Sequence, residues 1–63
     1  MTKGEEIIGR FNSENKTEVD VIKEKAIELI NLIEEHGKDP RRKAKSYTDI
    51  ETGVMFGIKS LFV

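Results

Sequence analysis

Five cations gather near the middle of this chain of 63 residues: Lys38, Arg41, Arg42, Lys43 and Lys45. The Asp39-Pro40 pair among them is typical of a helix start, with aspartate as the N-cap and proline at the first helical position. Most of the cluster would then occupy a first helical turn, where the helix dipole is already positive and backbone N–H groups donate readily to phosphate. The pattern favours a surface for a compact phosphorylated ligand. The alternative is a solvated charge run that keeps the chain soluble.

The positive charge continues along one face of the helix that follows. At 3.6 residues per turn, a strip about 60° wide holds Arg41, Lys45, Thr48, Thr52 and Lys59. Basic helices often follow the phosphates of a long nucleic acid. However, residues 1–36 carry a net charge of −4 and residues 37–63 carry +3, so the acidic half would repel an extended polyanion. We therefore expect a small anion as the ligand and no long nucleic acid.

The chain holds few groups that could perform catalysis or bind a metal. It has no cysteine and one histidine, and its glycines do not form a phosphate-binding loop. His36 could act as a general base, but its place at the end of a helix explains it without any function. Glu51 lies at the margin of an inward helix face, where burial would require a hydrogen bond or an ion pair. We expect no enzyme, no catalytic residue, no cofactor and no metal site.

The elements that must position these residues follow from capping signals and apolar periodicity. Thr17 is typical of a helix N-cap, with Asp20 three residues later and a segment of apolar residues at helical spacing behind it. The inward stripe of this predicted helix, residues 18–36, consists of Val19, Ile22, Ala26, Leu29, Ile30 and Ile33. Gly37 is predicted to end the helix in the left-handed conformation.

A second long helix is predicted over residues 40–62. Its inward stripe consists of Ala44, Tyr47, Ile50, Val54, Ile58 and Leu61. Because the connection between the two long helices is so short, they must run antiparallel as a hairpin. Residues 2–9 could add a short helix, which Thr2 and Glu5 would cap and which its two glycines would weaken.

These elements predict an all-α fold in a single small helical domain over residues 1–63. It consists of an N-terminal segment over 1–16, a helix over 18–36 and a helix over 40–62. A domain of this size buries only about 60% of its unfolded surface, and without cysteines it lacks disulfides, so we expect it to assemble as a symmetric homo-oligomer. Gly53 and Gly57 would let a helix of another subunit approach closely, unless they are merely tolerated there.

The composition is that of a folded protein outside the membrane. Charged residues make up 37% of the chain and hydrophobic residues 37%. No apolar run exceeds three residues, which excludes a transmembrane helix and the core of a secretory signal. We expect no membrane partner and a cytoplasmic location.

Short motifs of the second long helix resemble those of a known family: Pro40-Arg41-Arg42, Thr48-Asp49-Ile50-Glu51 and Val54-Met55-Phe56. They are similar to the proline–arginine, threonine–x–leucine–glutamate and valine–methionine–tryptophan motifs of phage anti-CBASS proteins of the second described kind. Upstream, Arg10-Phe11 and Ile22-Lys23 resemble that family's arginine–phenylalanine pair and the isoleucine–arginine or isoleucine–lysine step that opens its first long helix. The resemblance covers about residues 8–62.

The resemblance implies a specific assembly and function. Proteins of this family are homohexamers of helical hairpins that bind cyclic dinucleotides between pairs of subunits and cyclic trinucleotides where three subunits meet. They are sponges without catalysis: in the cytoplasm of the infected bacterial host they hold the messenger of the CBASS antiphage system, so that its effector stays inactive. The rival interpretation of the basic face is a small helical interaction module that binds a host protein or a nucleic acid.

The resemblance also assigns binding residues. Lys23 would meet the phosphate of a cyclic dinucleotide, although a lysine beside an apolar stripe is equally typical of a plain surface position. The family has a base-stacking tyrosine where this chain has Ser13, so that stacking, worth about 1–3 kcal/mol, is lost or is provided by Phe11. At the cyclic trinucleotide site the resemblance places Arg41 and Thr48, with Arg42 and Lys45 as nearby alternatives.

Overall fold

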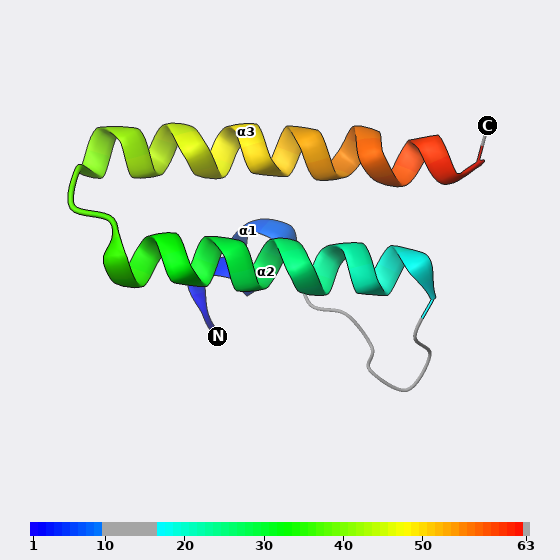
Figure 1. Cartoon of the computed structure of the whole chain (residues 1–63), viewed down its shortest axis with the longest axis horizontal. Helices are drawn as coiled ribbons and strands as arrows, with labels where there is room; N and C mark the ends of the chain where they lie inside the picture. Colours follow the sequence, from blue (N-terminus) through cyan, green and yellow to red (C-terminus); the bar gives the residue numbers. More distant parts are fainter. Residues whose placement is uncertain (10–16, 63) are drawn as a thin grey trace.

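The structure, a computed structural model, describes residues 1–9 and 17–62. The helices of this part of the chain are α1 (Lys3–Ile8), α2 (Glu18–His36), α3 (Pro40–Lys59) and the short 3-10 helix η1 (Ser60–Phe62). Figure 1 shows α2 and α3 side by side and antiparallel, with α1 lying against α2. The described residues include no strand, so the fold is all-α with a helical hairpin at its centre. None of the helices described is long and apolar enough to cross a membrane.

Each α-helix begins behind a capping residue. The Thr2 hydroxyl accepts a hydrogen bond from the backbone N–H of Glu5, and the Glu5 side chain accepts from the N–H of Thr2, which completes a capping box. Thr17 caps α2 in the same way, without the reciprocal bond. The Asp39 carboxylate accepts from two backbone N–H groups in the first turn of α3, at 3.0 and 3.2 Å. These local bonds fix the start of α3 and hence the places of its cations.

Two helix ends differ from the expectation. Gly37 is extended rather than left-handed, with φ −68° and ψ 139°, and its N–H donates to the carbonyl of Ile33 at 2.7 Å. An extended residue is needed there because a very short connection must carry the chain from the last turn of α2 across to the N-cap of α3. The α-helix predicted to reach residue 62 ends at Lys59, and the last residues narrow into η1, as helix C-termini often do.

The core is small and lies between the three α-helices. Its members are Ala26, Ile27 and Ile30 of α2 and Tyr47 of α3, and Ile30 is completely covered. Ile27 lies outside the predicted inward stripe and is buried because α1 packs over it. The contact is so close that a Cβ atom on Gly4 would lie 2.5 Å from the carbonyl oxygen of Ile27. The Gly4 N–H donates to Asn31 Oδ1 at 2.8 Å, which ties α1 to α2.

Large apolar faces stay uncovered in the single chain. The molecule is flat, 35 × 25 × 13 Å, and its surface of 4728 Å² exceeds the value of about 4100 Å² expected for a compact monomer of 7.2 kDa. Leu29 and Leu61, predicted to face inward, are 47% and 42% exposed, and Ala44 is exposed too. The prediction is wrong at these positions because periodicity identifies an apolar face, whereas each helix of a flat hairpin has neighbours along only part of that face.

Candidate functional site

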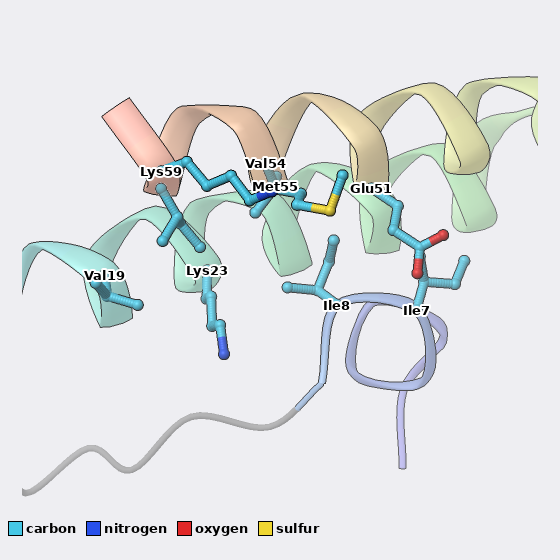
Figure 2. A pocket seen from close by; sticks show the side chains of 9 residues that line it. Ile7, Ile8, Val19, Lys23, Glu51, Val54, Met55 and Lys59 are labelled. Carbon is cyan, nitrogen blue, oxygen red and sulfur yellow. The ribbon is translucent and has the colours of Figure 1, made fainter. Parts of the chain in front are cut away.

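A crevice of about 450 Å³ opens between the three α-helices (Figure 2). Its described lining comes from Ile7 and Ile8 of α1, Val19 and Lys23 of α2, and Glu51, Val54, Met55, Ile58 and Lys59 of α3. The volume falls in the range of small-molecule sites, which are mostly apolar with a few polar groups that orient the ligand. α1 supplies one wall of the crevice. The close contact of Gly4 with α2 fixes the position of α1 and therefore the shape of the crevice.

The polar side chains of this crevice are two lysines and a carboxylate. Lys23 projects from α2 on the side facing away from α3, while the Lys59 side chain extends along α3 (Figure 2). Glu51 lies further along α3, near Ile7 of α1, so the crevice has a cationic end and an anionic end. The Lys59 ammonium lies 5.8 Å from the centroid of the Phe56 ring, close enough for a cation–π contact.

The predicted cation cluster divides between two faces of α3. Successive residues of an α-helix point about 100° apart, so Arg41 and Arg42 face different directions. Arg41 shares its face with Lys45 and Thr48. Arg42 instead lines a separate hollow of about 290 Å³ at the hairpin connection, together with Lys43. The structure thus brings together three of the four residues predicted for the cyclic trinucleotide site and separates Arg42 from them.

These cations differ in how far carboxylates neutralise them. Lys45 Nζ lies 2.9 Å from Asp49 Oδ1, and Arg42 Nε lies 3.5 Å from Asp39 Oδ2. Both pairs are exposed, so each contributes at most about 1 kcal/mol. No carboxylate of the described residues lies within ion-pair distance of Arg41, which is therefore available to an external anion. The backbone N–H groups expected to be free for phosphate are not free, because Asp39 accepts from them.

A buried tyrosine links the start of α3 to the end of α2. The Tyr47 hydroxyl donates to Glu34 Oε1 at 2.6 Å, and the Lys43 ammonium donates to the Glu34 carbonyl at 3.2 Å. The hydrogen bond from Tyr47, helped by the charge of Lys43, lowers the pKa of Glu34 below its usual 4.5. Burial, with the hydrogen bond to Glu34, raises the pKa of Tyr47 to about 12. The linkage holds the basic first turns of α3 at a fixed place on α2.

The Tyr47–Glu34 bond predicts how stability depends on pH. The folded pKa of Tyr47 is above its ordinary 10.0, so this contribution is complete below pH 10 and is lost as pH rises toward 12. The folded pKa of Glu34 is lowered, so its contribution is present above pH 4.5 and is lost as pH falls through the folded value. We expect Tyr47→Phe to lower the melting temperature at neutral pH and to flatten both limbs of its pH profile.

Circular dichroism melts across pH measure that difference between the wild type and Tyr47→Phe. An absorbance titration is a direct check, because Tyr47 is the only tyrosine in the chain. A phenol that titrates near pH 10 in the folded protein would contradict the linkage.

Of the residues predicted for a cyclic dinucleotide site, the structure describes only some. Lys23 lines the crevice, whereas Phe11 and Ser13 lie outside the described residues. The crevice also contains Met55 and Lys59, which the sequence reasoning did not connect with Lys23. Helical spacing placed Met55 beside the inward stripe of α3 and Lys59 on the strip with Arg41, but nothing local indicates that α1 and α2 face the part of α3 that bears them. No cluster of acidic or histidine side chains in the described ranges could hold a metal ion.

Comparison with known proteins gives a family match over almost the whole chain. The model of a family described as "Acb2/Tad1, hairpin domain" matches residues 1–62. Neither the curated proteins nor the solved structures contain a significant match to the chain. The match spans the hairpin, α1 and the crevice between them.

Proposed function

We propose that this chain, which belongs to the Acb2/Tad1 hairpin domain family, binds and sequesters cyclic oligonucleotide second messengers and so blocks activation of host CBASS antiphage effectors. The observation that carries the proposal is the family match over residues 1–62. Two surfaces with unneutralised cations support it: the Lys23 crevice and the Arg41 face of α3. The protein acts by stoichiometric capture rather than catalysis, in the cytoplasm of the infected host cell.

The crevice is the proposed cyclic dinucleotide site. Lys23 and Lys59 offer positive charge at one end, and the apolar walls from α1 and α3 offer surface to a base. Its volume of about 450 Å³ suits part of a cyclic dinucleotide, which agrees with a site completed by a second subunit. Phe11 and Ser13 belong to the same proposed site through their positions in the family pattern.

The Arg41 face is the proposed cyclic trinucleotide site. Arg41 provides a guanidinium that no carboxylate of residues 1–9 and 17–62 pairs with, and Thr48 lies on the same face two turns further along α3. The Thr48 hydroxyl donates to the Ala44 carbonyl at 3.3 Å, so its oxygen remains able to accept a hydrogen bond from a ligand. Several copies of Arg41 around a symmetry axis would repel one another unless an anion lay among them, which couples assembly to ligand binding.

Self-association is part of the proposal. Phe56 and Phe62 are 61% and 75% exposed on the outer side of α3 and on η1, and Leu32 of α2 is 55% exposed. A flat chain with so much apolar surface gains most from burying it against further copies. We propose a symmetric homo-oligomer, with the hexamer as the expected form.

The test is capture of cyclic dinucleotides and cyclic trinucleotides by the purified protein, followed by denaturation and analysis of the released ligand. Intact ligand in stoichiometric amount supports sequestration, and degraded ligand contradicts the absence of catalysis. The mass in dilute solution reports assembly at the same time. No binding of any cyclic species, together with salt-sensitive DNA binding, would favour an interaction module for nucleic acid or a host protein.

We expect Arg41→Ala to weaken cyclic trinucleotide capture by about tenfold or more, because a charge-assisted hydrogen bond to phosphate is worth about 1.5–3 kcal/mol. Calorimetry measures the change, and the oligomer should keep its mass. Lys25→Ala is the matched control: it removes a cation from an exposed position on α2, where the ammonium lies 3.7 Å from the Glu28 carboxylate. Equal trinucleotide affinity for Arg41→Ala and wild type would remove Arg41 from the site.

A further inference from the structure

Charged groups lie along the crevice in an order that matches the order of groups along a nucleotide. Glu51 and Lys59 are eight residues apart on α3, so their Cα atoms lie about 12 Å apart along the helix axis and about 80° apart around it. Lys23 lies near the Lys59 end, and Glu51 lies beside Ile7 (Figure 2). A nucleotide likewise has its anionic phosphate at one end and the hydrogen-bonding edge of its base at the other.

Glu51 is an exposed carboxylate at the margin of this crevice, and water solvates it in the free protein. An ionised carboxylate only accepts hydrogen bonds, and its two oxygens can accept from two donors side by side. Within the described residues Glu51 has no hydrogen-bond or ion-pair partner, although it borders an apolar wall. Neither Lys23 nor Lys59 lies within ion-pair distance of it. A ligand that fills the crevice would cover this carboxylate and must then supply donors to it.

The nucleobases differ sharply in what they offer a carboxylate. Guanine presents two adjacent donors, its N1–H and its exocyclic amino group, which match the two oxygens of Glu51. Adenine presents one amino donor next to a ring nitrogen that is an acceptor, and this lone pair would face a carboxylate oxygen. Hypoxanthine keeps the N1–H donor of guanine and lacks the amino group. The three bases therefore form a graded series for a carboxylate site.

From this geometry we infer that Glu51 makes the crevice selective for guanine-containing cyclic dinucleotides. Glu51 accepts from N1–H and the amino group of a guanine, while Lys23 and Lys59 meet the phosphates at the opposite end. The inference rests on the proposed cyclic dinucleotide binding and adds the base that is preferred and the residue that reads it. Lys59 leaves its contact with Phe56 to reach a phosphate, so its contribution is to affinity for every cyclic dinucleotide rather than to selectivity.

The test is calorimetry of the wild-type protein with the 3′,5′-linked cyclic dinucleotides of guanosine, inosine and adenosine. The wild type should bind the diguanosine species about tenfold or more tightly than the diadenosine species, the discrimination expected of one bidentate side chain–base pair. The diinosine species should fall between them. Glu51→Gln, which keeps the shape of the side chain and replaces one acceptor by a donor, should bring the three affinities together. Lys59→Gln should weaken all of them by a similar factor.

Glu28→Gln is the matched control, because it makes the same chemical change at an exposed position outside the crevice lining. It should leave the affinities and their order unchanged. Wild-type protein that binds the three ligands equally, or a guanine preference that persists in Glu51→Gln, would overturn the inference while leaving cyclic dinucleotide capture in place. Wild-type protein that binds none of them would overturn the proposed dinucleotide site itself, together with this inference.

Discussion

Replacing Ile30 with alanine is expected to unfold a large fraction of the protein at room temperature. Ile30 is completely covered at the centre of α2, where the three α-helices meet. Truncating a buried isoleucine to alanine costs about 2–5 kcal/mol, because the lost methyl groups leave a cavity that the surroundings fill only in part. A single core in a chain this short rarely supplies more than about 3–5 kcal/mol. The loss is therefore comparable to the whole free energy of unfolding.

Urea titration followed by circular dichroism measures this effect. Leu32→Ala makes a similar truncation two residues away on the exposed side of α2, where the side chain is 55% exposed, and in the isolated chain it should cost less than about 0.5 kcal/mol. Unfolding that depends on protein concentration would show that assembly adds to stability. An Ile30→Ala protein with the wild-type midpoint would contradict the small core described above.

The starts of the helices could be predicted from the sequence because the signals that set them are local. Thr2 with Glu5, Thr17, and Asp39 with Pro40 act within one turn of each helix, and each caps its helix in the structure. The antiparallel direction of the hairpin follows from its short connection. These features depend on residues that are neighbours in the chain, so no knowledge of distant contacts is needed.

Contacts between helices could not be predicted in this way. Gly4 counted against a helix at residues 2–9, because glycine costs about 1 kcal/mol relative to alanine in a helix interior. In the structure the missing side chain is what lets α1 lie on Ile27. Ile27 is buried because α1 packs over it, although it lies outside the inward stripe that periodicity predicts. Leu29 shows the reverse case, a position inside the stripe that no helix of the same chain covers.

The candidate site also has a part that the sequence predicts, set by local helix geometry, and a part that it does not predict, set by contacts between helices. The face shared by Arg41, Lys45 and Thr48 could be predicted, because helical periodicity alone determines it. The crevice could not, since it exists only where α1 approaches the side of α3 that bears Glu51 and Lys59. Sequence reasoning placed Glu51 at the edge of an inward helix face and expected burial there to require a hydrogen bond or an ion pair. That expectation is wrong, because Glu51 is exposed and water solvates it; it has no partner among the described residues and lies beside an opening large enough for a ligand.

Gly4→Ala should release α1 from the hairpin, a reversal of the usual effect of this substitution. In an open helix interior, glycine to alanine stabilises by about 1 kcal/mol. At Gly4 the new Cβ would lie 2.5 Å from the carbonyl oxygen and 2.8 Å from the Cα of Ile27, and neither backbone atom can move without shifting α2. Overpacking of this kind costs about 1–3 kcal/mol. Moving α1 outward relieves the clash but breaks the 2.8 Å bond from the Gly4 N–H to Asn31.

A six-residue helix that loses its packing contact with α2 does not persist in water, because helices this short are unstable alone. Amide hydrogen exchange should therefore show α1 unprotected in Gly4→Ala while α2 and α3 stay protected. Ile7 and Ile8 would leave the crevice, so cyclic dinucleotide capture should fall while trinucleotide capture at the Arg41 face is retained. Glu6→Ala is the control within α1, since it removes only an exposed ion pair with Lys3 at 3.4 Å. Protected α1 amides in Gly4→Ala would mean that the helix is not held by close contact with Ile27.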